Sequence, residues 1–247
     1  MRASESKHRA DGGGAAFAPT LWTMVLNAGQ TDTDGVAAFG RLAQTYWYPV
    51  YAFIRRKGYA HADAEDLTQG FFVLLQEKRA LAGVHPDKGR FRAFMLTVLR
   101  RFLISEWHRT QAQRRGGGIQ FVALDREEHE TRFRQAAPAG DPDKAYDRDV
   151  ALALLCRTMA RLGEEYEQAG RGLVFAALRP HLTGERDLPD YESVAAALGM
   201  TSAAVKMAVM RLRRRFGVLL RDHVAQIVAD PALVEDELRH LVAAMCP

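Results

Sequence analysis

The residue types that could do chemistry in this chain are mostly cations, and they gather on two short stretches. In residues 202–216 lysine and arginine alternate with apolar side chains at helical spacing, and in residues 90–115 arginines surround one tryptophan. Guanidinium and ammonium groups bind phosphate oxygens, and an aromatic ring among them can stack on an unpaired base. The chemistry that these residues offer is therefore the binding of nucleic acid.

The later stretch has the frame of a helix-turn-helix. Residues 191–198 predict a short helix with an apolar inner face. Gly199 then supplies a tight turn that other residues resist because it needs a positive φ. Thr201 or Ser202 can cap the next helix, which buries an apolar residue at every turn as far as residue 216.

A helix-turn-helix places the start of its second helix in the major groove, against the base edges. The predicted base-reading positions are Ser202, Ala203, Lys206 and Met207, with the capping residue Thr201 beside them. The predicted phosphate contacts, which give affinity and little sequence choice, are Arg211, Arg213 and Arg214. The alternative is a solvated basic helix in an unrelated bundle.

The earlier stretch has one clear apolar stripe. Large apolar residues recur from Phe91 to Phe102 at the spacing of an amphipathic helix. Trp107 falls on nearly the opposite side, among arginines that have only Glu106 as acidic compensation, and this excess favours a phosphate partner. The alternatives are a solvated face for the arginines and ordinary packing for Trp107. The predicted nucleic-acid contacts are Arg90, Arg92, Arg100, Arg101, Trp107, His108 and Arg109.

Residues 63–78 predict a helix with a protein-contact surface. Glu65, Gln69, Phe72 and Gln76 form one stripe apart from most of the apolar core stripe. An aromatic side chain flanked by acidic and amide groups is typical of an interface centre with a polar rim. The alternative is that Phe72 packs inside a larger bundle.

The elements that must position these residues are almost all helical. Further helices are predicted at residues 36–57, divided or kinked at Pro49, and at 147–162, 164–182 and 231–244. Three glycines at 116–118 interrupt the pattern, and a short extended piece is predicted at 119–124. We predict an all-α fold with two helical domains, residues 20–113 and 146–247, joined by a flexible linker, residues 114–145. Residues 1–19 are predicted to be a disordered tail.

Composition limits the function further. The 247 residues carry 34 lysines and arginines against 30 acidic residues, a net charge of +4. Cys156 and Cys246 lack metal-ligand spacing, which predicts reduced cysteines and neither a metal nor a cofactor. There is no run of 18 apolar residues and no apolar signal segment at the start, so we expect a cytoplasmic protein without a membrane span.

Three motifs in this order resemble the sigma-70 family, in its small extracytoplasmic-function (ECF) subgroup. Residues 63–72 (DAEDLTQGFF) look like region 2.2, residues 91–109 are similar to regions 2.3 and 2.4, and residues 191–216 resemble region 4.2. Residues 164–189 are longer than in most small members, and the residues after Arg221 extend beyond the usual end. A packing or regulatory helix is the only role that we predict for this extension.

The resemblance implies a subunit that brings RNA polymerase core to promoter DNA. Region 2.2 would bind the β′ clamp helices through Asp63, Glu65, Asp66, Gln69 and Phe72. The loop at residues 82–90 and the helix after it would read and open the −10 element. The helix-turn-helix would read the −35 element, and the β flap and an anti-sigma factor are further candidate partners. Arg101, Ser105 and Ser193 stand where the family often has asparagine, aspartate and glutamate, so the base preferences are not carried over.

Two other classes of function compete with this interpretation. His61, Glu65 and Asp66 are close enough on a helix to suggest metal ligands, but no second constellation completes a site, and no nucleophile motif or phosphate loop is present. We therefore expect no enzyme activity. A helix-turn-helix regulator is the stronger rival, and it would bind duplex DNA on its own, as a dimer on two half-sites. The purified protein distinguishes the two, because a sigma factor should need polymerase core.

Overall fold

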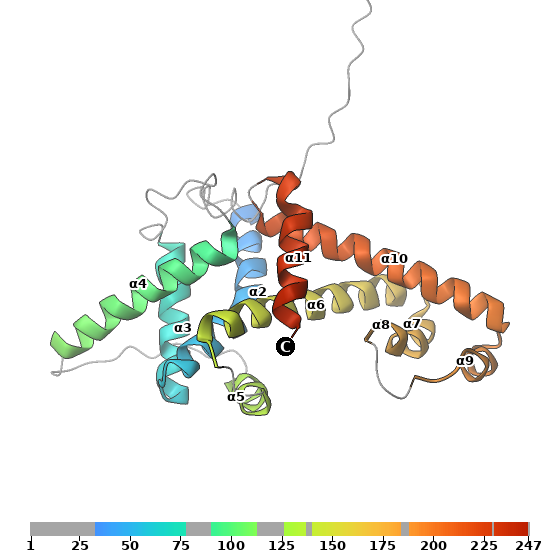
Figure 1. The fold of residues 1–247 in the computed structure, drawn as a ribbon, viewed down its shortest axis with the longest axis horizontal. Helices are drawn as coiled ribbons and strands as arrows, with labels where there is room; N and C mark the ends of the chain where they lie inside the picture. The colour runs from blue at the N-terminus through green and yellow to red at the C-terminus, as the bar shows by residue number, and fades with distance from the viewer. Residues whose placement is uncertain are drawn as a thin grey trace, which may run out of the picture.

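The computed structural model describes residues 33–77, 90–112, 126–136, 140–183, 188–228 and 230–246, and every regular element in them is a helix (Figure 1). The all-α prediction is therefore confirmed. The predicted tail at residues 1–19, the loop at 82–89 and the extended piece at 119–124 lie outside the described residues. The elements are α2 (Thr33–Arg56), α3 (His61–Gln76), α4 (Phe91–Ala112), α5 (Arg126–Gln135), α6 (Pro142–Gln168), α7 (Gly172–Leu178), α8 (Pro180–Thr183), α9 (Tyr191–Leu198), α10 (Ser202–Ile227), the 3-10 turn η2 (Pro231–Leu233) and α11 (Val234–Met245).

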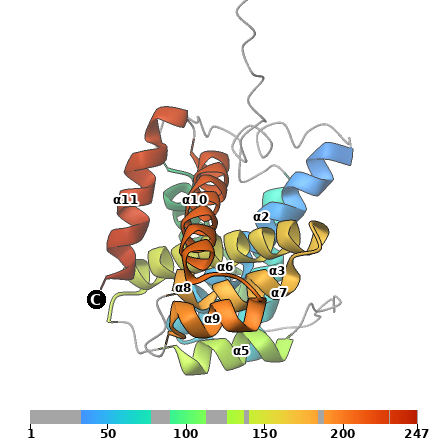
Figure 2. The ribbon, with the colours of Figure 1, turned by 90° about the vertical axis from the view of Figure 1, so that its right-hand side faces the viewer.

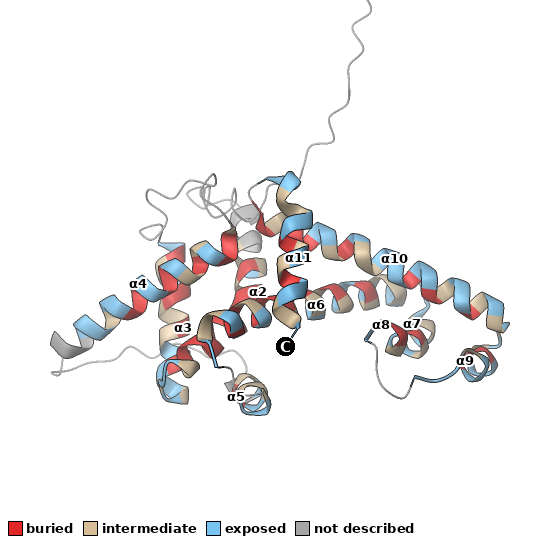
Figure 3. Cartoon of the chain, in the orientation of Figure 1, coloured by how far each residue is buried: buried red, intermediate tan, exposed pale blue. Residues whose placement is uncertain are grey.

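Most of the buried side chains form one cluster, which we call the main core. It takes residues from α2, α3, α4, the first half of α6, the last turns of α10, and α11. Figure 3 shows these buried residues along the facing sides of the helices. Tyr46, Phe53, Phe71 and Phe91 are fully buried there. Burial of such a side chain stabilises a fold by about 1.5–3 kcal/mol, so this cluster fixes how α4 lies on α2 and α6.

A second cluster, the distal core, lies at the other end of α6 and α10. It comprises Leu162, Leu178, Val194, Ala195, Val205, Val209, Leu212 and Leu219. Because α6 leaves the main core where α10 returns to it, the two helices run antiparallel between the cores. Figure 2 shows this pair viewed from the α7–α9 end, with α11 beside α10. Between the cores Thr158 Oγ1 and His223 Nδ1 lie 2.9 Å apart.

Local chemistry explains where α6 begins and ends. The Asp141 side chain accepts a hydrogen bond from the Asp143 backbone N–H, and Pro142 occupies the first turn, where its missing donor does no harm. The predicted break between residues 162 and 164 is wrong, because α6 continues to Gln168. Gly163 is needed for close packing instead: a Cβ there would lie 3.0 Å from the Phe175 ring. Pro49 does not divide α2, because the helix runs on to Arg56, and a kink at Pro49 stays a prediction.

The predicted linker at residues 114–145 is partly helical. It contains α5 and the first residues of α6, neither of which the sequence pattern indicated. The division of the chain into domains stays a prediction. The main core nevertheless includes residues from both predicted units, with Tyr146, Val224 and Leu241 buried in the same cluster as Tyr46 and Phe91.

Candidate nucleic-acid interface

The helix-turn-helix has the Gly199 turn and the Thr201 cap that the sequence predicts, and a further cap at Asp190 that was not predicted. The Asp190 side chain accepts a hydrogen bond from the Ser193 N–H at 2.6 Å and starts α9. Gly199 ends α9 in the left-handed conformation, with φ at 62°. Thr201 starts α10 by accepting from the Ala204 N–H at 3.2 Å. The two helices meet at 98°, within the range of about 90–120° typical of this motif.

The predicted DNA-contacting residues of this motif lie on its outer side. Val205, Val209 and Leu212 hold α10 to the distal core, which turns the opposite side of the helix outward. The structure leaves Ser202 half-buried and exposes the other predicted positions: Thr201, Ala203, Lys206, Met207, Arg211, Arg213 and Arg214.

Two of these cations have partners on other helices. The Lys206 ammonium lies 5.8 Å from the centre of the Tyr191 ring, an intramolecular cation–π contact. Arg213 donates through Nη2 to the His181 carbonyl oxygen at 3.0 Å, which ties α10 to α8. Arg213 thus helps to hold α10 against α8. The sequence could not reveal this contact, because it joins residues 32 positions apart.

The second half of α4 presents an aromatic and basic surface. Trp107 is 53% exposed, and His108 meets it edge-on with ring centroids 4.9 Å apart. Beside Trp107 lies a cavity of about 560 Å³. Sequence reasoning missed the wall that α2 and the turn after it contribute, because these residues are distant in sequence. The cavity is lined by Phe53, Lys57, Tyr59, Arg100, Leu103, Ile104, Trp107 and His108.

The arginines of α4 differ in what they meet. Arg101 is exposed, Arg100 forms an exposed ion pair with Asp143, and Arg109 pairs with Glu106 at 2.7 Å. Exposed pairs of this kind contribute about 0–1 kcal/mol, so they yield readily to a phosphate.

Arg92 departs from the prediction that it contacts nucleic acid. Its side chain is buried, with the residue only 6% exposed, and its guanidinium is held by Asp147 of α6 and Glu237 of α11. Arg90 contacts Glu237 as well, with Nε 2.9 Å from Oε2. The apolar stripe of the sequence predicted that Arg92 lies outside the core. The prediction failed because the acidic partners that cover Arg92 lie 55 and 145 residues later in the chain.

The predicted protein-contact stripe on α3 is divided between surface and interior. Of its residues, Gln76 is exposed and Gln69 is half-buried; Asp63 and Asp66, which only the family resemblance implies as polymerase contacts, are exposed. Glu65 and Phe72 are buried. Phe72 stacks on Trp47 of α2 with ring centroids 5.3 Å apart, so it packs inside the bundle as the alternative interpretation had it.

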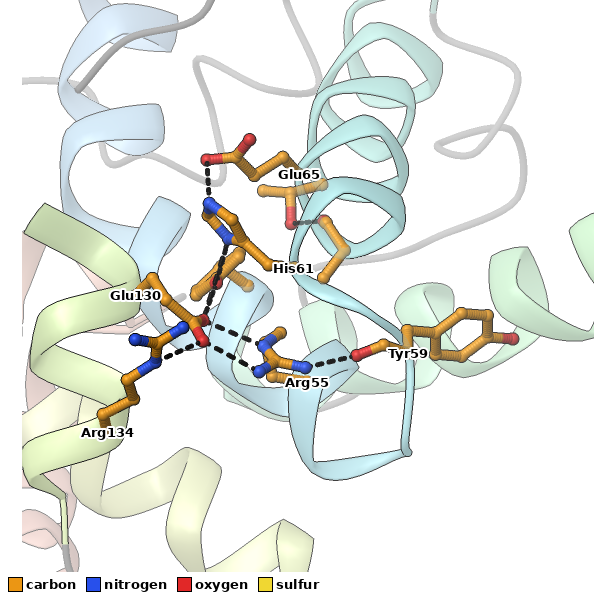
Figure 4. Close-up of polar contacts among 9 residues, drawn as sticks. Arg55, Tyr59, His61, Glu65, Glu130 and Arg134 are labelled. Carbon is orange, nitrogen blue, oxygen red and sulfur yellow. Dashed lines mark hydrogen bonds and ion pairs between the residues drawn. The ribbon is translucent and has the colours of Figure 1, made fainter. Parts of the chain in front are cut away.

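A polar cluster around Glu130 fixes α5 beside the start of α3 (Figure 4). The buried Glu130 carboxylate accepts from Arg55 at 2.9 and 3.0 Å, from Arg134 at 3.0 Å and from the Tyr51 hydroxyl at 2.5 Å. His61 Nδ1 lies 3.7 Å away. The hydrogen bonds from Arg55, helped by those from Tyr51 and Arg134, lower the pKa of Glu130 to about 2 despite its burial. The carboxylate is therefore ionised at neutral pH.

The structure also bears on the competing kinds of site. Within the described ranges, no three histidine, cysteine, aspartate or glutamate side chains gather as metal ligands would. No single helix of the described chain is long and apolar enough to cross a membrane.

Comparison with known proteins gives one match. None of the curated proteins and none of the solved structures matches this chain. The family described as ECF sigma factor matches residues 67–221, which reach from α3 through α4 and the helix-turn-helix into the last turns of α10. The matched residues make up more than half of the sequence, and the chain therefore belongs to the ECF sigma factor family.

Proposed function

We propose that this chain brings RNA polymerase core to promoters by binding a −35 element with its helix-turn-helix and a −10 element with α4, without a catalytic step of its own. The observation that carries the proposal is the family match together with two outward basic surfaces, one at each end of the α6–α10 pair. We further infer that it works in the cytoplasm, where the polymerase is.

The −35 contact rests on the exposed side of α10. Ala203, Lys206 and Met207 face outward on its first two turns, where a recognition helix meets base edges. Arg211 and Arg214 follow on the same side and would hold phosphates. Lys206 would leave the Tyr191 ring for the DNA at little cost, because an exposed cation–π contact contributes only about 0.5–1 kcal/mol.

The −10 contact rests on the second half of α4. A base released from the duplex could stack on the exposed face of Trp107, which contributes about 1–3 kcal/mol per base. Lys57, Arg100 and His108 line the cavity beside this ring and would meet the phosphates of the same strand. Arg92 has no part in this contact because its guanidinium is buried among carboxylates.

The polymerase contact rests on α3. Asp63, Asp66 and Gln69 are the residues of the predicted core-polymerase contact that reach the surface, and we propose that they meet the β′ clamp helices. The helix-turn-helix would meet the β flap. An anti-sigma factor would compete for the surfaces of α3 and the helix-turn-helix.

The decisive experiment is transcription in vitro with purified core polymerase on genomic fragments, with mapping of the start sites. We expect defined starts that require the protein, with Lys206→Ala weakening use of the −35 element and Trp107→Ala weakening opening at the −10 element. Arg239→Ala, which removes an exposed arginine on α11, serves as the matched control. Specific binding to duplex DNA without core, and no start sites with it, would establish the rival regulator.

The polymerase surface has its own test. Asp66→Ala combined with Gln69→Ala removes two groups at the surface of α3 without touching the buried Phe72. We expect weaker retention of core polymerase in a pull-down, whereas Asp222→Ala, an exposed acid on α10, should leave retention unchanged. Equal retention by all three proteins would remove this surface from the proposal.

A further inference from the structure

The helix that follows the helix-turn-helix in sequence, α11, makes its buried polar contacts with the start of α4. Glu237 of α11 is 1% exposed and lies between two arginines of the −10 unit. Arg92 donates from Nε to Oε1 at 2.6 Å, and the Arg90 Nε lies 2.9 Å from Oε2. One carboxylate from the far end of the chain therefore holds the two cations with which α4 begins.

A second carboxylate closes the network. Asp147 of α6 accepts from Arg92 and lies 2.9 Å from His240 Nε2, one turn after Glu237 on α11. Leu241 of the same helix is buried in the main core. A buried carboxylate is costly unless it is paired, so this arrangement holds α11, α6 and α4 in one relative position, which an exposed ion pair would not do.

The two arginines are not equivalent. Arg92 is enclosed by both carboxylates, whereas the Arg90 side chain is 34% exposed and meets Glu237 as an ion pair without an aligned hydrogen bond. A guanidinium carries five N–H donors, so this contact leaves others to meet a phosphate. Fixing a long side chain before it binds reduces the entropy that binding would otherwise cost.

We propose that Glu237 is a positioning residue for promoter reading, which orients Arg90 at the start of α4 toward the DNA backbone at the −10 element. The inference rests on the proposed function of α4. Its consequence is that the extension after the −35-reading motif governs contacts at the other promoter element.

The test uses holoenzyme assembled with core polymerase on three DNA fragments: the intact promoter, one with the −10 element replaced and one with the −35 element replaced. Glu237→Gln keeps the shape of the side chain and removes its charge. We expect it to weaken binding to the intact and the −35-replaced fragments about fivefold, the scale of one charged contact. The −10-replaced fragment should be unchanged, because without that element the DNA is not opened onto α4 and the Arg90 contact is not made.

The matched control is Glu235→Gln, also on α11, which breaks the exposed pair of Glu235 with Arg221 of α10 and should stay within about twofold of wild type. Arg90→Gln and the double variant complete a cycle. If Glu237 acts through Arg90, Glu237→Gln should weaken binding no further in the Arg90→Gln background.

Three results would overturn the inference. Tighter binding by Glu237→Gln would mean that the carboxylate masks Arg90 instead of orienting it. Glu237 would have a purely structural role if Glu237→Gln weakened DNA binding as much in the Arg90→Gln background as in the wild type. The same conclusion would follow if it weakened binding equally on all three fragments. If Glu237→Gln lacks the native circular dichroism spectrum, the test rests on Arg90→Gln, which keeps the Arg92–Glu237 pair. A loss of binding by Arg90→Gln that also affects the −10-replaced fragment would then contradict the inference. Failure of wild-type holoenzyme to start transcription would instead count against the proposed function.

Discussion

Two buried tyrosines differ in what their hydroxyl groups meet. The Tyr51 hydroxyl donates to Glu130 at 2.5 Å, whereas the Tyr146 hydroxyl is buried with no hydrogen-bond partner among the described residues. A buried polar group without a partner costs about 1–3 kcal/mol, and a satisfied one stabilises. The same chemical change, tyrosine to phenylalanine, should therefore have opposite effects at the two positions.

We expect Tyr146→Phe to raise the free energy of unfolding by about 1 kcal/mol and Tyr51→Phe to lower it by about 1–3 kcal/mol. Urea unfolding followed by circular dichroism measures both, and each variant serves as the control for the other. A loss of stability in Tyr146→Phe would mean that its hydroxyl has a partner outside the described residues.

His223 makes the junction between the two cores sensitive to pH. Burial, with Arg157 nearby, lowers its pKa from 6.5 to about 4. As pH falls below 6.5, His223 becomes protonated in the unfolded chain but stays neutral in the folded chain, so the free energy of unfolding falls. The change is at most about 1.4 kcal/mol per pH unit and is complete below the folded pKa.

Urea midpoints at pH 7.5 and pH 5.5 should therefore differ more for wild type than for His223→Gln. Glu130 does not contribute to this difference. The stability that its ionised carboxylate provides is lost only as pH falls from 4.5 toward 2, which is below the range compared. Equal pH dependence of the two proteins would show that another group controls the junction.

At the scale of single elements, local chemistry determined what the sequence could predict. Gly199 and Thr201 specify the turn and the cap of the helix-turn-helix through their own backbone and side chain, and the structure confirms both. α5 has no such signal. A ten-residue polar helix is marginal by itself, and this one is held by distant residues: Glu130 meets Tyr51 and Arg55, 79 and 75 residues earlier, and Phe133 packs on the main core.

The basic side of α10 allows a prediction about salt. Arg211 is exposed on the proposed DNA-facing side, and a phosphate contact releases counterions whatever the base sequence. Arg211→Ala should weaken holoenzyme binding on every promoter tested and reduce the slope of log affinity against log salt by about one unit. The same measurements on Arg239→Ala, in the exposed pair with Asp236, should match wild type. A loss confined to one base position would make Arg211 a base reader.

At the scale of the whole molecule, the main core joins segments from both ends of the sequence. The sequence pattern predicted a helix close to α11 but could not place it, because the partners of Glu237 and Leu241 are known only once the chain is folded. The same limit explains Arg92: periodicity identifies the apolar face of a helix but not a distant carboxylate that covers another face.

Leu241 and Val242 provide a matched pair for testing this connection. Leu241 is buried in the main core, and the next residue, Val242, is exposed. Leu241→Ala should lower the free energy of unfolding by about 2–5 kcal/mol, because α11 supports the same core. The fluorescence of Trp47 in α2, measured with Trp22 and Trp107 replaced by phenylalanine, should report the same loss. Val242→Ala should change the free energy of unfolding by less than about 0.5 kcal/mol. Similar effects of the two variants would mean that α11 is not part of the unit that contains α2.

The position of α11 also bears on the order of events while the protein is made. A ribosome delivers α2, α3 and α4 first, but the carboxylate that neutralises Arg92 and the leucine that completes their core come only with residues 237 and 241. During translation the segment of α2, α3 and α4 therefore carries a cation without its full complement of partners and an open apolar face, the kind of surface on which chaperones act. A chain released before residues 237 and 241 are made would lack both this carboxylate and this leucine.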